Sequence, residues 1–163
     1  MNKSVLELGA GSGLISFVAV QKGAIVTGSH INLKVIENLQ FNMTQNQLKL
    51  EAVLSDLFDS MPDNQYFDYI LINPPYYPKK PLTIDEKAWF CGSKFEYFTK
   101  MFAQLHSRKF GNAVMILSED CEINTIQQIG LQAGIQMQLE QKEKIFWEWN
   151  FIFKLSKTGE KSY

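Results

Sequence analysis

The sequence predicts an α/β fold, in which a mostly parallel sheet is flanked by helices. Three observations indicate this class: short apolar runs alternate with segments of helical period, a glycine-rich turn closes the first apolar run, and two strand-like runs joined by a tight turn end the chain. Alternation of strands and helices is typical of parallel sheets, whereas strands joined by a tight turn pair antiparallel. The 163 residues are enough for one domain with its own core.

The first half of the chain contains four expected strands and two expected helices. The strands are short apolar runs, at residues 4–8, 24–27, 50–54 and 67–72, and the helices are at residues 14–22 and 32–45. In the second helix, Val35, Leu39 and Met43 lie on one apolar stripe. The run at residues 67–72 is almost continuously apolar, which predicts a central strand of the sheet.

A loop rich in proline and lysine, residues 73–92, opens the second half. Ser93 and Glu96 then form a capping-box pattern, Ser-x-x-Glu, which predicts the start of a helix with Phe98 and Phe102 on its apolar face. The remaining elements are a strand, a helix and two further strands, at residues 113–117, 123–134, 135–141 and 146–155.

The last of these strands carries a stripe of large apolar residues. Its alternate positions share one face and are Trp147, Trp149, Phe151, Phe153 and Leu155. Such a stripe can pack in the core or serve as a platform for a ligand. We expect core packing, because a strand at this place in an α/β fold needs one buried face.

Composition excludes some classes of function. A formal net charge of −1 excludes a strongly basic, histone-like nucleic-acid binder. All but one of the sixteen basic residues are lysine, which counts against a dedicated reader of DNA sequence, because Arg is the preferred partner of phosphates and guanine edges. We expect a single domain over residues 1–157 and a frayed tail over residues 158–163.

The cysteines and the N-terminus predict the compartment. Cys91 and Cys121 are not closely spaced, and His30 and His106 do not complete a zinc pattern, so we expect no metal and two reduced thiols. No apolar signal segment follows Met1, and no apolar run is long enough to span a membrane. These features predict a soluble, cytoplasmic protein with no membrane contact.

A turn with three glycines links the first strand to the first helix. Glycine lets the backbone bend tightly and lets a ligand approach the main chain, and the helix start offers unpaired N–H groups. A dinucleotide fingerprint needs glycine where Leu14 stands, and the Gly-Lys-Ser/Thr of a phosphate loop is absent. An ordinary glycine-rich turn is the alternative to a binding site. The segment consists of Glu7, Leu8, Gly9, Ala10, Gly11, Ser12 and Gly13.

The Glu-x-Gly-x-Gly-x-Gly pattern of this turn resembles the first motif of the class I S-adenosylmethionine-dependent methyltransferases. In that family, the turn holds the methionine and ribose portions of the cofactor. The resemblance therefore implies that residues 7–13 bind S-adenosylmethionine and its product S-adenosylhomocysteine.

The tetrad Asn73-Pro74-Pro75-Tyr76 follows the strand at residues 67–72, at the end where open parallel sheets bind ligands. It suits a planar NH₂ group, whose nitrogen is a poor nucleophile because its lone pair is delocalised. The Asn73 side-chain oxygen and the Pro74 carbonyl can each accept one N–H bond, while Tyr76 offers a ring for stacking. Proline restricts the backbone, so catalysis would rest on positioning and electrostatic complementarity. A proline-rich turn that ends a strand is the structural alternative.

The glycine turn and the tetrad together resemble the amino-directed class I methyltransferases, including their "methyltransferase small" domains. The resemblance covers residues 5–155 and implies a Rossmann-like, seven-stranded sheet with an antiparallel last strand and helices on both faces. It also implies cofactor contacts from His30 and Ile31 after the second strand, from Asp56 and Leu57 after the third, and from Asn73. His30 stands where the family usually has an acidic residue that binds both ribose hydroxyls, and an imidazole can make only one such bond well.

The target of the tetrad in this family is either an adenine amino group or the glutamine amide of a translation release factor. The stretch from Glu86 to Gly92, with Trp89 at its centre, is similar to a segment of the HemK-type release-factor glutamine methyltransferases. The resemblance therefore favours protein N-methylation, with Asn73, Pro74, Pro75, Tyr76 and Trp89 binding the substrate. Cys91 departs from that segment, where a glycine is usual.

Two other functions stay open at this point. An adenine N6-methyltransferase acting on RNA or DNA would use Lys79, Lys80 and Lys87 beside the tetrad, although these lysines also fit a solvated loop. A catalytically weak scaffold subunit is favoured by His30 and by a chain start only eight residues before Gly9, without the family's preceding helix. From that start we expect a partner subunit or a second copy to cover the cofactor site.

Overall fold

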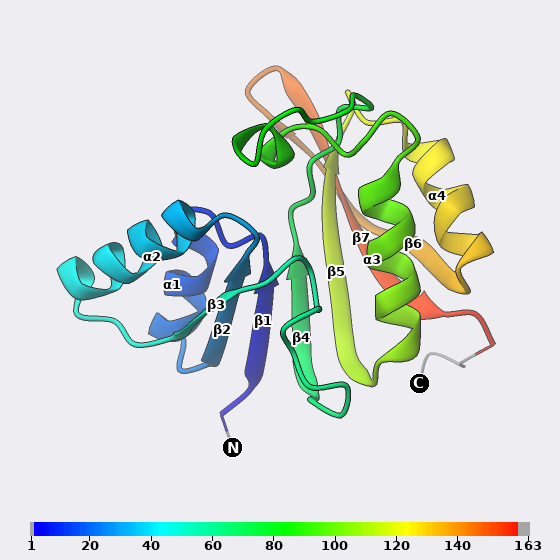
Figure 1. Cartoon of the computed structure of the whole chain (residues 1–163). Helices are drawn as coiled ribbons and strands as arrows, with labels where there is room; N and C mark the ends of the chain where they lie inside the picture. The colour runs from blue at the N-terminus through cyan, green and yellow to red at the C-terminus, as the bar shows by residue number, and fades with distance from the viewer. Residues whose placement is uncertain (1, 160–163) are drawn as a thin grey trace.

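Seven strands form one sheet in the order β3-β2-β1-β4-β5-β7-β6, in a computed structural model that describes residues 2–159 (Figure 1). The strands are β1 (Ser4–Leu8), β2 (Ile25–His30), β3 (Glu51–Leu54), β4 (Phe67–Ile72), β5 (Phe110–Ser118), β6 (Ile135–Ile145) and β7 (Glu148–Lys157). Each predicted strand is present, with bounds that differ by a few residues. The Rossmann-like α/β class is confirmed.

The sheet is parallel except for β7, which is antiparallel to both of its neighbours, β5 and β6. This confirms the antiparallel last strand. Helix α4 (Ile123–Gln132) carries the chain across the sheet, so β6 runs in the common direction and becomes the edge strand. The tight turn after β6 then returns the chain into the space beside β5. The antiparallel strand therefore lies inside the sheet rather than at its edge.

The helices divide between the two halves of the sheet (Figure 1). Helices α1 (Leu14–Gln21) and α2 (Leu33–Asn46) connect β1, β2 and β3, while α3 (Glu96–Ser107) and α4 serve the half that contains β5, β6 and β7. From β1 the strand order proceeds one way to β2 and β3 and the other way to β4 and β5. Because crossovers between parallel strands are right-handed, α1 and α2 lie on one face of the sheet and α3 and α4 on the other. Phe98, Met101 and Phe102 of α3 are fully buried in the core that this face shares with β4 and β5.

Helix α3 begins differently from the prediction, because the capping box does not form. Phe95 occupies the N-cap position with φ of 59°, and the Glu96 carboxylate accepts the N–H of Lys94 at 2.9 Å, not that of Ser93. A turn closed by Phe95 N–H and Gly92 C=O, 3.1 Å apart, precedes the helix. Burial of the Phe95 ring in the core moves the helix start beyond the position that the local pattern predicts.

The predicted aromatic stripe of residues 147–155 runs from the hairpin turn before β7 into the core. Phe153 and Leu155 are buried, which confirms core packing there, but Trp147 is 90% exposed and the prediction is wrong for it. Pairing of β7 with β5 ends at Asn150 opposite Ser118, whereas pairing with β6 continues to Glu148 opposite Ile145. The β6–β7 hairpin therefore extends beyond the sheet, where its residues have no core to enter.

Both chain ends of the described part lie away from the carboxyl ends of the parallel strands (Figure 1). Thr158 continues the fold past β7, since its N–H donates to the Gly134 carbonyl at 2.9 Å. Residues 160–163 of the predicted tail lie outside the described residues. Within residues 2–159, no helix combines the length and the apolar character needed to cross a bilayer.

Candidate active site

Two cavities meet at the carboxyl ends of the parallel strands, on either side of Asn73. The large cavity has a volume of about 760 Å³ and lies over β1, β2 and β3, while the small cavity has about 290 Å³ and lies over β5 and β7. Asn73, Pro75, Ala88 and Trp89 line both of them. A group bound in one cavity would therefore approach a group bound in the other at the end of β4.

The large cavity is lined by residues at the carboxyl ends of four neighbouring strands, β1, β2, β3 and β4. Of the predicted cofactor residues, those that line it are Gly9, Gly11, His30, Ile31, Asp56, Leu57 and Asn73. The turn after β1 is held open because the N–H groups of Gly9 and Ala10 both donate to the Ser29 carbonyl at 2.9 Å. The other predicted residues of the turn, Glu7, Leu8, Ala10, Ser12 and Gly13, do not line the cavity.

Glu7 lies beneath the turn and supports the first helix. Its carboxylate accepts the N–H of Ser16 at 2.9 Å and also the Ser16 hydroxyl. Burial raises the pKa of Glu7, although both hydrogen bonds from Ser16 oppose this shift. Its contacts hold the start of α1 against β1, so its part in any site is to position the glycine turn.

His30 lines the large cavity, and one of its ring nitrogens is occupied by a backbone hydrogen bond. Its Nδ1 accepts the N–H of Asn32 at 3.0 Å, which leaves the ring proton on Nε2. Burial lowers the pKa of His30, so the neutral ring is favoured. The buried side chain of Asn32 caps α2 through the Lys34 N–H and donates to Asp85 Oδ1 at 2.6 Å. Asp85 thus ties the loop after β4 to the end of β2.

Asp56 is held at the cavity by contacts that the sequence did not indicate. Lys100 of α3 lies 2.9 Å from the Asp56 carboxylate and 2.7 Å from that of Asp59. Leu57 has φ of 57°, and the Ser55 hydroxyl bonds its carbonyl at 2.8 Å. Lys100 was missed because the pattern of α3 shows only its apolar face, and its partners are remote in the chain.

The loop of residues 73–92 is folded back on itself into two paired limbs. Tyr77 donates its N–H to the Trp89 carbonyl at 3.1 Å and accepts that of Cys91 at 2.9 Å. This pairing places Trp89 between the two cavities. The Cys91 thiol is buried and lies 3.3 Å from the Tyr77 carbonyl, and burial raises its pKa to about 11. The thiol therefore contributes to packing of the loop.

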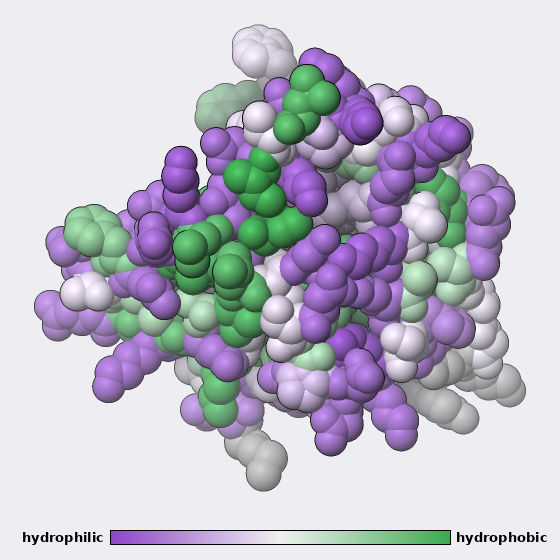
Figure 2. All heavy atoms as spheres, in the orientation of Figure 1, coloured by the Kyte–Doolittle hydropathy of each residue, from purple (hydrophilic) through white to green (hydrophobic). Residues whose placement is uncertain are grey.

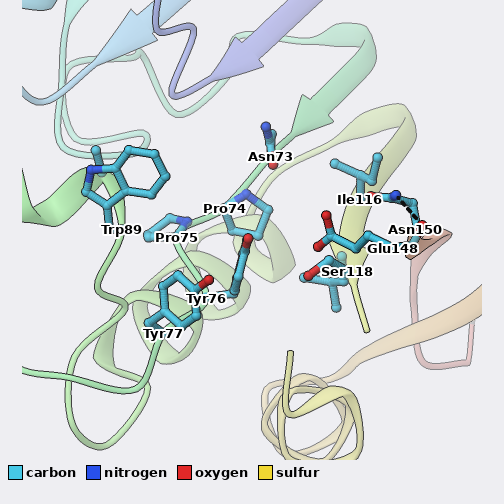
Figure 3. Close-up of a pocket in the computed structure, with 12 residues that line it drawn as sticks. Asn73, Pro74, Pro75, Tyr76, Tyr77, Trp89, Ile116, Ser118, Glu148 and Asn150 are labelled. Carbon is cyan, nitrogen blue, oxygen red and sulfur yellow. Dashed lines mark hydrogen bonds between the residues drawn. The ribbon is translucent and has the colours of Figure 1, made fainter. Parts of the chain in front are cut away.

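The small cavity contains the whole predicted tetrad. Figure 3 shows Asn73, Pro74, Pro75 and Tyr76 along one side, Trp89 beside them and Ile116, Ser118, Glu148 and Asn150 on the opposite side. The Tyr76 and Tyr77 rings are 4.7 Å apart, and burial raises the pKa of Tyr76, so its phenol is kept neutral. The residues of β5 and β7 were missed by sequence reasoning, because only the position of β7 next to β5 brings them here.

Basic residues contribute little free positive charge around the small cavity. Arg108 is buried and donates to the carbonyls of Pro62 at 2.9 Å and Met61 at 3.0 Å. Lys79 lies over the Phe90 ring, and Lys80 and Lys87 line the large cavity. The arginine is thus committed to the fold and is unable to bind a phosphate.

The chain is similar to one known family and to several named proteins. The model of the methyltransferase small domain matches residues 1–89. A protein of Methanocaldococcus jannaschii named as a putative protein N5-glutamine methyltransferase is 41% identical over 78 residues, which are 47% of this chain and 39% of that protein. A tRNA1(Val) (adenine(37)-N6)-methyltransferase of Shewanella baltica is 32% identical over 124 residues, which are 71% of this chain and 52% of that protein.

The fold also matches solved structures. A chain of the E. cuniculi Mtq2–Trm112 complex, described as responsible for methylating the translation termination factor eRF1, aligns with a TM-score of 0.70. The match has 20% identity and covers 96% of this chain and 86% of that one, so it concerns the fold alone. The chain spans about half or less of the length of the two relatives described above.

Proposed function

Because the chain belongs to the methyltransferase small domain family of S-adenosylmethionine-dependent methyltransferases, we propose that it transfers a methyl group to the side-chain amide of a protein glutamine. The observation that carries this proposal is the meeting of the two cavities at Asn73. The large cavity would hold the cofactor and the small cavity the acceptor amide. The acceptor nitrogen would then lie beside the methyl group at the end of β4.

The residues of the large cavity fit S-adenosylmethionine. Gly9 and Gly11 bring bare backbone to the cavity, the Asp56 carboxylate can accept the adenine amino group, and the Nε2–H of His30 can donate to a ribose hydroxyl. When bound, this cofactor supplies an electrophilic methyl group. His30 makes one such bond where a carboxylate makes two, so we expect weaker binding by about ten- to a hundredfold.

The tetrad would activate the acceptor by holding it. The Asn73 side-chain oxygen and the Pro74 carbonyl would each accept one N–H of the amide, and the two prolines restrict how far these acceptors can move. Held in this way, the nitrogen would turn its lone pair away from the carbonyl it conjugates with. No general base is needed, because the proton can leave after transfer.

Adenine in RNA is the second candidate acceptor. The tRNA adenine methyltransferase relative aligns with more of this chain than the glutamine methyltransferase relative does, 71% against 47%. Against it stand the buried Arg108 and the near-neutral net charge of −1. The similarity of residues 86–92 to the release-factor enzymes supports the glutamine amide.

A partner chain is also proposed. Figure 2 shows a band of hydrophobic residues among hydrophilic ones on one face. Among the large apolar side chains of the described residues, Leu14 and Leu82 are two of the most exposed, at 71% and 79%. The Mtq2–Trm112 complex has a similar fold and includes a second protein. The mass of the protein in solution, alone and mixed with candidate subunits, tests this proposal.

The function is tested by methyl transfer from radiolabelled S-adenosylmethionine. The acceptors are a release factor with a Gly-Gly-Gln loop, the same protein with Gly-Gly-Asn, and an adenine-containing RNA hairpin. Transfer to the first acceptor alone is the expected result. Transfer to the RNA alone would establish the second candidate instead, and binding without any transfer would support a scaffold subunit.

Acid should weaken cofactor binding through His30. The ring must be neutral for Nδ1 to accept the Asn32 N–H, and burial lowers its pKa below the ordinary 6.5. We expect S-adenosylhomocysteine affinity to be constant above pH 7 and to fall by about fivefold once the pH drops below this lowered pKa, as that hydrogen bond is lost. His30 also makes folding stability depend on pH. As the pH falls below 6.5, the unfolded chain binds the proton while the buried ring of the folded chain stays neutral, so the free energy of unfolding decreases.

Calorimetric titrations between about pH 5 and 8 measure this change. His30→Gln is the control, since its amide does not titrate and its affinity should stay level with pH. An identical pH profile in the wild type and this variant would assign the change to another group.

A further inference from the structure

Glu148 brings a carboxylate to the small cavity from the side opposite the tetrad. It is the first residue of β7, and it lines the cavity together with Asn150. Figure 3 shows its carboxylate pointing across the cavity toward Pro74 and Tyr76. A charged group therefore faces the place where the proposed acceptor amide would bind.

No basic residue neutralises this carboxylate within residues 2–159. The ion pairs of the described residues involve other groups, and no described side chain donates a hydrogen bond to the Glu148 carboxylate. The Asn150 amide donates to the backbone carbonyl of Glu148, at 3.4 Å, and not to its carboxylate. The lysines of the hairpin lie on a different face, because the Lys142 and Lys144 ammonium groups lie over the Trp149 ring, 4.4 and 5.7 Å from its centre. Successive side chains of a strand alternate, so Trp149 and Glu148 point to opposite faces. Glu148 is thus free to meet a ligand.

A carboxylate at this position discriminates between the candidate acceptors. It accepts hydrogen bonds from peptide N–H groups and attracts cationic side chains. It opposes a nucleotide, because phosphate is negative and because the ring nitrogen beside the adenine amino group is itself a hydrogen-bond acceptor. The charge therefore favours a protein acceptor with basic residues near the methylated position.

We propose that Glu148 is a specificity-determining residue that recognises a Lys or Arg side chain flanking the methylated glutamine. This inference rests on the proposed function, because it concerns the acceptor bound in the small cavity. The carboxylate would affect how fast and how tightly the acceptor binds, and it would take no part in the transfer of the methyl group. The preference should therefore weaken as salt screens the charges.

The test uses two Gly-Gly-Gln peptides that differ only in flanking residues, lysine in one and glutamate in the other. For the wild-type protein at low salt, we expect kcat/KM to favour the lysine peptide by about tenfold. Glu148→Gln should reduce this ratio to about two, and Glu148→Lys should reverse it. S-adenosylhomocysteine affinity of each variant, measured by calorimetry, reports whether the fold and the large cavity are intact.

Glu143→Gln is the charge-matched control. Glu143 lies opposite Asn150 in the hairpin but does not line the small cavity, and its carboxylate accepts a bond from the Gln141 amide at 3.1 Å. This variant should keep the wild-type ratio. A ratio that Glu148→Gln leaves unchanged would overturn the inference and leave the proposed function intact.

A failure of the proposed function gives a different result. If neither peptide is methylated but the RNA hairpin is, both the function and the inference are overturned. If nothing is methylated, calorimetry with Gly-Gly-Asn peptides carrying the same flanks decides: a lysine preference that Glu148→Gln removes upholds the inference, and equal binding of both peptides overturns it.

Discussion

Replacement of Asn73 with alanine should lower methyl transfer by about a hundred- to a thousandfold and leave the fold intact. The side chain is exposed and makes no hydrogen bond to other described residues, so its removal disturbs little packing. It lies where the two cavities meet, and its oxygen is one of two acceptors proposed to hold the reacting NH₂ group. The loss should appear mainly in kcat, measured with saturating S-adenosylmethionine.

The matched control for this variant is Asn64→Ala. Asn64 is also exposed and lies three residues before β4, so the length of that strand separates it from Asn73. It should retain wild-type activity and the same thermal stability. Full activity of Asn73→Ala would remove the tetrad from the mechanism.

Replacement of Gly13 with alanine should lower the free energy of unfolding by about 2–5 kcal/mol. Gly13 has φ of 88°, which strains any residue with a Cβ by about 1–2 kcal/mol. The new Cβ would also overlap Leu39 Cδ1 and lie 3.0 Å from Phe17 Cζ, and overpacking of this kind costs about 1–3 kcal/mol. Urea unfolding followed by circular dichroism measures the loss.

Gly11→Ala is the comparison, because it changes the same turn with much less crowding. Its φ is 54°, and among the described residues an added Cβ would have one close neighbour, the Gly9 carbonyl oxygen at 3.8 Å. We expect a stability loss of about 1–2 kcal/mol from strain alone. Gly11 lines the large cavity whereas Gly13 does not, so S-adenosylhomocysteine affinity should suffer more in this variant. Equal destabilisation by both substitutions would contradict the packing role of Gly13.

Much of the fold was predictable because its signals are local. The strand at residues 67–72 is recognisable from its apolar run. The turn at Gly9 and Gly11 is recognisable because closely spaced glycines are typical of a tight backbone turn. Prediction was wrong where burial overrode the local pattern. Phe95 enters the core and moves the start of α3. Trp147 lies in the hairpin turn before β7, beyond the pairing of β7 with β5.

The sequence by itself determined the fold class, the Rossmann-like order of elements and the position of the tetrad after β4. Each of these depends on residues close together in the chain. Seven of the twelve residues that it predicts for cofactor binding line the large cavity. Tertiary structure alone decided that Lys100 holds Asp56, that Asp85 ties the loop to Asn32 and that Glu148 faces Tyr76 across the small cavity. These pairs are separated by 44, 53 and 72 positions. The packing of α3, the folding of the loop after β4 and the insertion of β7 beside β5 bring these remote side chains together.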